Sequence, residues 1–280
     1  LKECGIKTFA VTEVTDIPVL KEVLDNEDIL IMRSTCIEKE AKIIAENGCI
    51  ATIGSAEACA VMNRTSAKLG VKTKCHLKID TGMGRYGFMP SEVSKAIDCY
   101  QAENLEFIGA YTHFSDAFGN TELTKSQLVL FKDTIKQIEN AGYNVGTLHC
   151  ANSPALLNVE DVCLDSVRLG SAFTGRVITR SKTKLNRIGL LEAEVIETKT
   201  VPAGYSIGYM GNFKTTKETK IAIVPFGHYD GFGLTQDKEE ISLHYVLSVF
   251  KQFLQKKKTY VRINGRMFRI IRKIGLSHTA

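Results

Sequence analysis

Three short polar stretches stand where predicted β-strands end. In the first, His76, Lys78 and Asp80 alternate with Leu77 and Ile79, so the three polar side chains share one face of a strand. This strand runs into a glycine-rich loop that ends at residue 87. Similar polar strand ends recur at 111–113 (Tyr-Thr-His) and 149–153 (His-Cys-Ala-Asn-Ser). Three such ends in order indicate one site built from successive strands.

Groups that suit phosphate binding follow the last of these strands. Ser153 lies in the stretch 149–153, and Gly170 and Ser171 follow the strand predicted at 166–169. In α/β barrels the loops after the last two strands commonly bind phosphate through hydroxyls and backbone N–H groups. Asn-Ser-Pro alone would indicate a turn. Arg168 favours a site, because a charge at a strand end is costly unless it is paired.

A regular alternation of strands and helices positions these residues. It predicts a parallel sheet covered by helices, whose carboxyl ends form the site. A barrel needs eight strands and we count seven, so we expect an eight-stranded α/β barrel that lacks its first strand. The predicted strands span 7–11, 28–33, 49–54, 75–80, 107–113, 147–151 and 166–169, and the predicted helices span 19–24, 37–47, 56–69, 92–103 and 124–141.

The pattern changes after about residue 176 and predicts a β-rich second domain. The predicted strands there span 188–193, 193–199, 220–224 and 259–263, and one amphipathic helix is inserted at 239–258. We therefore predict a barrel domain over 1–180, incomplete at its N-terminus, and a β-domain over 184–280, incomplete at its C-terminus.

Composition excludes several classes of function. The 280 residues are 44% hydrophobic and 24% charged, as in soluble globular proteins, and the net charge of +5 is modest. No nucleic-acid-binding motif accompanies the basic residues, so we expect no nucleic-acid partner. No apolar run could span a bilayer. The eight cysteines form no C-x-x-C pair, which is typical of a reduced, intracellular protein, and the six histidines lack metal-ligand spacing, so we predict no metal site.

The glycines at 82, 84 and 87 match the G-x-G-x-x-G dinucleotide fingerprint only formally. That fingerprint requires a helix that starts within the glycines. Here Phe88, Met89 and Pro90 intervene before the next predicted helix. A dinucleotide-binding fold is therefore the weaker interpretation.

Six motifs, taken in order, resemble those of the alanine racemase family, and the resemblance covers nearly the whole chain. Members of this family are pyridoxal 5′-phosphate enzymes with a barrel and a β-domain. The motifs are His-Leu-Lys-Ile-Asp-Thr-Gly-Met-Gly-Arg-Tyr-Gly (76–87), Tyr-Thr-His-Phe (111–114), His-Cys-Ala-Asn-Ser (149–153), Val-Arg-Leu-Gly (167–170), Gly-Tyr-Met-Gly-Asn-Phe (208–213) and Pro-Phe-Gly-His-Tyr-Asp-Gly (225–231).

The resemblance implies the cofactor-binding residues. Arg168 resembles the arginine that hydrogen-bonds the pyridine nitrogen of pyridoxal phosphate. Ser153 and the backbone of Gly170 and Ser171 resemble the phosphate site, and Asn152 would support that loop.

The resemblance also implies the catalytic residues. Tyr209 resembles the tyrosine that exchanges the α-proton on the L face, and His113 the histidine that links Arg168 to it. Arg85 resembles the arginine that contacts the cofactor's phenolic oxygen and the substrate carboxylate. Lys78 matches a lysine that is carbamylated in several relatives and orients that arginine.

Some family features are missing. The lysine that forms the Schiff base lies in the family at the end of the first strand, and no lysine here has that context. We therefore expect the chain as given not to racemise by the family mechanism. The inserted helix at 239–258 and the ending Gly-Leu-Ser-His at 275–278 resemble membrane-anchored serine/alanine racemases of glycopeptide resistance.

From the resemblance we expect an amino-acid racemase. It would interconvert L- and D-alanine, or serine, by two-base α-proton exchange on a pyridoxal-phosphate aldimine, to supply D-amino acids for the cell wall. We expect a cytoplasmic head-to-tail homodimer with shared sites, with membrane contact only if an upstream domain exists. The alternatives are a non-catalytic pyridoxal-phosphate-binding protein and a barrel decarboxylase, which would need acidic side chains for a distal amine.

Overall fold

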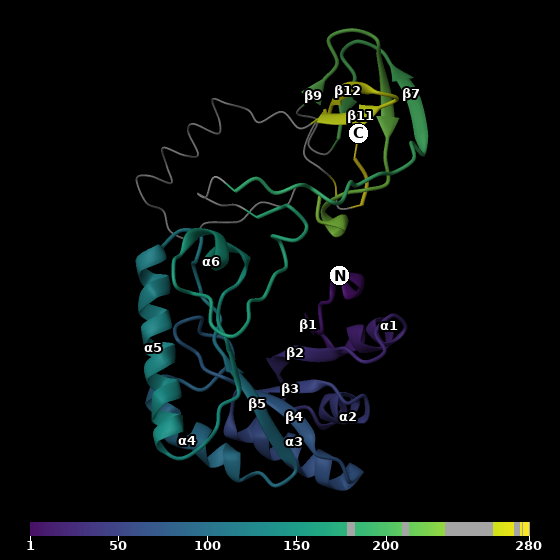
Figure 1. Cartoon of the computed structure of the whole chain (residues 1–280). Helices are drawn as coiled ribbons and strands as arrows, with labels where there is room; N and C mark the ends of the chain where they lie inside the picture. The colour runs from purple at the N-terminus through teal and green to yellow at the C-terminus, as the bar shows by residue number, and fades with distance from the viewer. Residues whose placement is uncertain (178–182, 209–212, 233–259, 272–274, 276, 280) are drawn as a thin grey trace. The chain divides into compact units, whose positions relative to one another are not determined.

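The chain forms two compact units, Leu1–Gly189 and Leu190–Ala280. Figure 1 shows the computed structural model, which describes all residues except 178–182, 209–212, 233–259, 272–274, 276 and 280. The predicted catalytic Tyr209 and the predicted helix at 239–258 lie outside the described residues.

Six parallel strands form the sheet of the first unit. They lie in sequence order and each pairs with the next, which is the arrangement of a (β/α) barrel wall and confirms the predicted fold class. The strands are β1 (Thr8–Val11), β2 (Asp28–Ser34), β3 (Ile50–Ile53), β4 (Thr73–Lys78), β5 (Leu105–Tyr111) and β6 (Thr147–His149).

The predicted length of the seventh strand, 166–169, is wrong. Only one bridge forms, between Ser166 and His149. The N–H of Ser166 donates to the carbonyl of Leu148, but the N–H of Arg168 donates to the carbonyl of Ala151. Between these two hydrogen bonds the segment of Ser166 advances by two residues and the segment after β6 by three. The register therefore slips by one residue, and the ladder ends after one bridge.

Helices flank the sheet between successive strands (Figure 1). Helix α3 (Ala56–Leu69) begins and ends as predicted. Ser55 caps its first turn, and Gly70 ends it with a left-handed backbone. The predicted helix at 92–103 is broken by single 3-10 turns, η3 (Pro90–Glu92) and η4 (Cys99–Gln101). The helices are α1 (Ile17–Lys21), α2 (Glu38–Glu46), α3 (Ala56–Leu69), α4 (Val93–Asp98), α5 (Thr121–Asn140) and α6 (Ser153–Asn158), and two further 3-10 turns are η1 (Lys2–Cys4) and η2 (Val14–Asp16).

The two faces of the sheet differ in chemistry. Leu77 and Ile79 of the β4 segment are fully buried and join the hydrophobic core, as the alternation predicts. Burying one such side chain stabilises the fold by about 1.5–3 kcal/mol. His76 and Lys78 are also buried but belong to a polar cluster. Because Leu77 and Ile79 pack into the hydrophobic core, the side chains of His76 and Lys78 must lie on the opposite face of the strand.

The second unit is β-rich, as predicted. β7 (Glu197–Val201) pairs antiparallel with β10 (Thr219–Ile223), and β8 (Ser206–Ile207) pairs with β9 (Phe213–Lys214). β11 (Tyr260–Ile263) and β12 (Arg266–Arg269) form a hairpin. Its turn residues Asn264 and Gly265 have φ of 46° and 79°, the positive values that a two-residue hairpin turn requires. A 3-10 turn, η6 (His228–Asp230), lies between β10 and β11.

The strand predicted at 188–193 is wrong. An apolar run forms a strand only where another strand pairs with it, and the described part of the chain shows no pairing of this run. Leu190 is instead 85% exposed.

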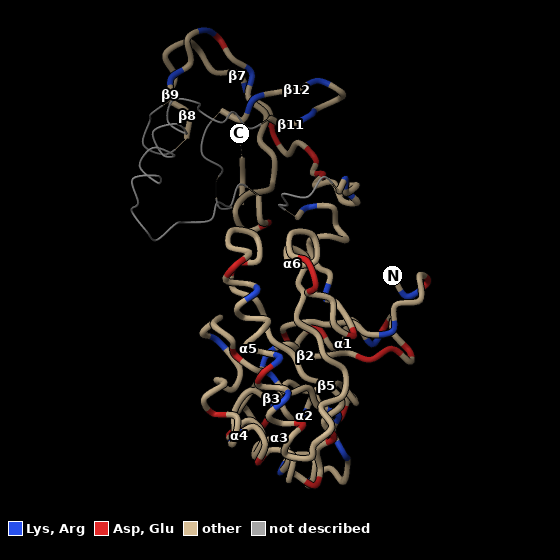
Figure 2. Tube along the Cα trace, turned by 60° about the vertical axis from the view of Figure 1, so that its left-hand side comes forward, with Lys and Arg blue, Asp and Glu red and all other residues tan. Residues whose placement is uncertain are grey.

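Charges of both signs are interspersed along the described trace (Figure 2). The ion pairs are mostly at the surface, as in Lys2 with Asp25 and Lys42 with Glu46. Among the described helices, none combines the length and the apolar character needed to cross a membrane.

Candidate functional site

A cluster of buried polar side chains lies at the carboxyl ends of β4, β5 and β6. His76 and Lys78 come from β4, Tyr111 ends β5 and His149 ends β6, and none of these four is more than 6% exposed. Arg168, in the segment after the Ser166 bridge, contacts His149 and Tyr111. These five residues are called the strand-end cluster below. Four of them come from the three polar strand ends that the sequence singled out, and Arg168 comes from the strand predicted at 166–169.

Arg168 directs most of its hydrogen-bond donors to fixed acceptors. Its Nη1 donates to Nδ1 of His149 at 2.7 Å and approaches the carbonyl of the same residue at 3.3 Å. Its Nη2 donates to the carbonyls of Thr112 at 2.8 Å and Cys150 at 3.1 Å, and lies 3.5 Å from Nδ1 of His113. Its Nε is buried and has no hydrogen-bond partner among the described residues. Since a guanidinium has five N–H donors, the Nε–H is the one left for a ligand.

Two cations share the ring of Tyr111. Nζ of Lys78 lies 4.9 Å from the ring centroid and Cζ of Arg168 lies 5.1 Å from it. A cation within about 6 Å of an aromatic face is attracted by the ring quadrupole. No carboxylate forms an ion pair with either cation within the described ranges. Asp80 offsets part of the charge on Lys78, but the cluster keeps a net positive charge and suits an anionic ligand.

The hydroxyl of Tyr111 fixes the ring. It donates to the carbonyl of Met32 at 2.6 Å and lies 3.0 Å from Oγ1 of Thr52, which donates to the carbonyl of Ile31. Burial raises the pKa of Tyr111 to about 12, so the phenol stays neutral. Tyr111 therefore serves as a platform for the cations.

Burial also sets the charge of the nitrogen bases. It lowers the pKa of Lys78 to about 8, and the charge of Arg168 contributes. Burial lowers the pKa of His76 and of His113 to about 4, and that of His149 to about 2. The three histidines are neutral at pH 7, whereas Lys78 stays mostly protonated, with about a tenth of it in the neutral form.

The glycine-rich loop after β4 is closed on the carboxylate of Asp80. This carboxylate accepts the backbone N–H groups of Gly82, Met83, Gly84 and Arg85 at 2.7–3.2 Å. Burial acts to raise the pKa of Asp80, but these donors outweigh it and hold the pKa below its usual value. The N–H groups are thus occupied and the next α-helix starts only at Val93, which counts against a dinucleotide site.

The charge of Arg85 acts on the strand-end cluster, where it helps to lower the pKa of Lys78. The Arg85 side chain is exposed and sits beside Tyr86, with Cζ 5.7 Å from that ring. The side chain forms no hydrogen bond or ion pair with any part of the chain that the structure describes, although the backbone N–H donates to Asp80. Arg85 therefore influences Lys78 through its charge, while no hydrogen bond joins the two side chains in the described structure.

The predicted phosphate residues come together at the start of α6. Oγ of the buried Ser153 accepts the N–H groups of Gly170 at 3.0 Å and Ala172 at 3.2 Å, so its own hydrogen can be donated to an anion. Asn152 caps α6 through its contact with the N–H of Ala155. Ser171 is exposed in the same turn.

Sequence reasoning missed α6 and gave no role to three members of the cluster. Asn152 at the N-cap with Pro154 in the first turn is a helix-start signal that could have revealed α6. His76, Tyr111 and His149 were noted only as polar strand ends, because ring stacking cannot be read from spacing. The rings of Tyr111 and His149 stack at 4.7 Å and 10°.

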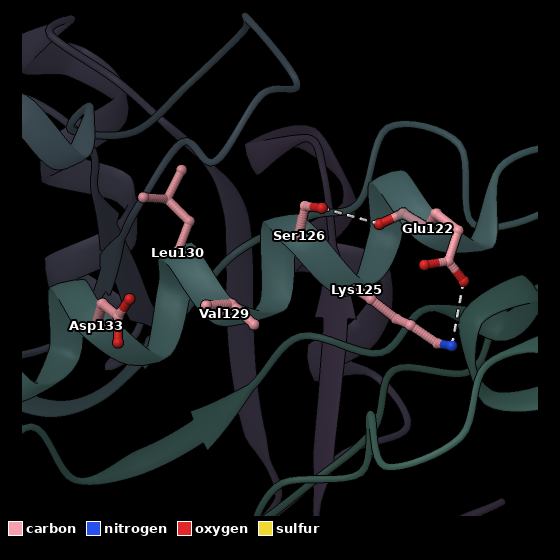
Figure 3. A pocket seen from close by; sticks show the side chains of 6 residues that line it. All are labelled: Glu122, Lys125, Ser126, Val129, Leu130 and Asp133. Atoms are coloured by element: carbon pink, nitrogen blue, oxygen red, sulfur yellow. Dashed lines mark hydrogen bonds and ion pairs between the residues drawn. The ribbon is translucent and has the colours of Figure 1, made fainter.

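One surface hollow, on α5, is not part of this site. It has a volume of about 510 Å³ and is lined only by residues of α5 (Figure 3). The ammonium of Lys125 pairs there with Glu122, and no member of the strand-end cluster lines it.

Comparisons with known proteins place this arrangement in context. The family model for the alanine racemase N-terminal domain matches residues 1–177, and that for the C-terminal domain matches 189–277. An alanine racemase of Methanococcus maripaludis is 31% identical over 237 residues, covering 82% of this chain and 63% of that protein. The chain spans about three fifths of the length of several curated relatives.

Solved structures show the same fold. Alanine racemase of Clostridium difficile 630 is 26% identical with a TM-score of 0.81, and the match covers 100% of this chain and 69% of that one. Alanine racemase of Bartonella henselae with covalently bound pyridoxal phosphate is 22% identical with a TM-score of 0.71, and covers 100% and 72%. The second likeness concerns the fold alone.

Proposed function

Because the chain belongs to the alanine racemase family, we propose that it supplies the cofactor and substrate site of an amino-acid racemase acting on alanine or serine. The observation that carries this proposal is the buried Nε–H of Arg168, which lacks a partner among the described residues while the other guanidinium donors are occupied.

Pyridoxal phosphate fits this donor. When bound, it withdraws electrons from the α-carbon of an amino acid and so makes the α-proton acidic. Arg168 would donate its Nε–H to the pyridine nitrogen. Since an arginine stays protonated, that nitrogen would stay unprotonated. Arg168 would thereby weaken the electron withdrawal and favour racemisation over side reactions.

Ser153 and its neighbours fit the phosphate. The hydroxyl of Ser153 has accepted two N–H groups and keeps a hydrogen for a phosphate oxygen. The backbone N–H groups of Gly170 and Ser171 would add donors, and Asn152 would hold the turn. The net positive charge of Lys78 and Arg168 would further favour an anion in this region.

Arg85 and Lys78 would act on the substrate side. Arg85 would bind the substrate carboxylate after its exposed side chain turns towards the cluster. The lowered pKa of Lys78, about 8, leaves neutral amine available to add to carbon dioxide with loss of a proton. The resulting carbamate would be an anion able to orient Arg85.

Proton exchange would need a residue outside the described part of the chain. We assign it to Tyr209 of the partner subunit in a head-to-tail homodimer, with His113 linking Tyr209 to Arg168. A phenol titrates near pH ~10, so it needs cationic neighbours to act as a base. Mixing full-length subunits that carry Tyr209→Phe with full-length subunits that carry Arg168→Glu should restore some racemisation if sites are shared, and no rescue would count against the dimer.

Cofactor binding by the chain is the first test. Calorimetric titration should show pyridoxal phosphate binding at least tenfold more tightly than pyridoxal, and Ser153→Ala should reduce that difference. Equal affinities for the two compounds would overturn the phosphate site. Racemisation by the full-length protein that the gene encodes separates a racemase from a non-catalytic binder, since only a racemase converts L-alanine or L-serine to the D form.

A further inference from the structure

A directed chain of hydrogen bonds runs from Arg168 through two histidines. Nη1 of Arg168 lies 2.7 Å from Nδ1 of His149, and Nε2 of His149 lies 2.8 Å from Nδ1 of His76. An arginine can only donate, so Nδ1 of His149 must accept. The single proton of the His149 ring therefore sits on Nε2 and is donated to His76. His76 in turn must carry its proton on Nε2.

The ring of His76 has room only because a glycine faces it. A shift in the register between β4 and β5 pairs His76 with Gly109. A Cβ atom on Gly109 would lie 2.6 Å from Nε2 and 2.7 Å from Cε1 of His76, closer than Cβ atoms approach other heavy atoms. Any side chain at position 109 would push the ring away from His149.

We propose that His149 and His76 are positioning residues for Arg168 and that Gly109 makes room for them. The two neutral rings hold Nη1, while the carbonyls of Thr112 and Cys150 hold Nη2, so the Nε–H keeps one direction. The inference rests on the proposed function only for what that Nε–H contacts. The tautomer order itself follows from the geometry.

Loss of the acceptor on His76 would disturb Arg168 at a distance. The Nε2–H of His149 would be left without a partner, or the ring would move its proton to Nδ1 and face Arg168 donor to donor. The first outcome leaves a buried donor unpaired and the His149 ring less firmly held, and the second releases Nη1. His76→Leu removes the acceptor, whereas His76→Asn keeps one, because the amide oxygen of asparagine can occupy the place of Nδ1.

Nuclear magnetic resonance of the whole chain, labelled with ¹⁵N at its six histidines, tests the tautomer order without cofactor or activity. Both His149 and His76 are expected to carry the proton on Nε2. In His76→Leu the His149 signals should move away from this pure tautomer, and in His76→Asn they should stay. A proton on Nδ1 of His149 in the unaltered chain would overturn the proposal, and this arm needs no variant to fold.

Binding of pyridoxal phosphate tests the consequence. His76→Leu and Gly109→Ala should each weaken its affinity at least tenfold, and His76→Asn should largely preserve it. Gly189→Ala is the matched control, since a Cβ there meets nothing within 4 Å. The double variant Gly109→Ala with His76→Asn should recover affinity, because asparagine lacks the atoms that meet the new methyl group.

The histidine spectra and the binding measurements together distinguish the positioning of Arg168 from the proposed cofactor site. If the unaltered chain shows the expected tautomers and binds no pyridoxal phosphate, the proposed function fails and the positioning of Arg168 stands. If the unaltered chain binds it and His76→Leu binds it equally well, the positioning role is refuted while the cofactor site stands.

Discussion

Replacing Arg168 by lysine should destabilise the first unit, although the charge is kept. An ammonium group offers three donors at one atom, whereas the guanidinium reaches His149, Thr112 and Cys150 at the same time. A lysine at this position can approach only part of that set. The remaining buried acceptors lose their donor.

The expected cost follows from these contacts. A buried polar group left unsatisfied costs about 1–3 kcal/mol, so the loss of two partners amounts to about 2–6 kcal/mol. A typical domain is stable by only about 5–15 kcal/mol, so the effect is easily measured. Burial would also lower the pKa of the new lysine, and its neutral form would leave still fewer donors.

Hydrogen exchange followed by mass spectrometry measures this change within the first unit. The opening free energy of peptides from β4, β5 and β6 should fall by about 2 kcal/mol or more in Arg168→Lys. Arg64→Lys, at an exposed position on α3, is the matched control and should change it by less than about 0.5 kcal/mol. A change in Arg168→Lys no larger than that of the control would refute the reasoning.

Three further predictions concern charge and backbone strain. The pKa of Lys78 is about 8 in the folded chain and near 10.5 in the unfolded chain, so the unfolded chain holds the extra proton between these values and the free energy of unfolding rises with pH. In urea unfolding at pH 8 and pH 10.5, Lys78→Met should remove about 3 kcal/mol of that rise. An equal rise in the variant and the unaltered chain would contradict the lowered pKa. The pKa of His113 is about 4 in the folded chain and 6.5 in the unfolded chain, so the free energy of unfolding falls as the pH drops from 6.5 towards 4. His113→Gln should reduce this loss by about 3 kcal/mol in urea unfolding. An unchanged dependence on acid pH would show that His113 is not buried in its neutral form. Gly87→Ala should destabilise the chain more than Gly84→Ala. Both glycines have positive φ, but only at Gly87 would a new Cβ lie 2.8 Å from a backbone atom, the nitrogen of Asp80. The free energies of unfolding in urea should differ by about 1–3 kcal/mol, and equal values would contradict the close approach.

Regular periodicity made much of the first unit predictable. The alternation at His76–Asp80 identified both the buried apolar face and the polar one, since a strand has only two faces. Capping residues fixed α3, where Ser55 and Gly70 satisfy the ends. The predicted elements that failed depend on pairing: the ladder after β6 ends because the register slips at Arg168, and the apolar run at 188–193 has no paired strand in the described structure.

The site was predictable in its residues but not in its connections. The glycine spacing of 82–87 suggested a fingerprint, yet it serves to let four N–H groups converge on Asp80. The order of protons along Arg168, His149 and His76 depends on which ring atoms meet, and that requires three strands in register. The contact partners of Arg85 likewise depend on a loop conformation that spacing does not determine.

The central claim is that this site labilises the α-proton of a small amino acid on bound pyridoxal phosphate. The most direct measurement is proton nuclear magnetic resonance of L-alanine in D₂O with the full-length protein and pyridoxal phosphate, with chiral chromatography of the product. The α-proton signal should disappear while D-alanine forms, or the same should happen with serine, and Arg168→Glu should abolish both changes. Bound cofactor with no α-proton exchange from either amino acid would contradict it.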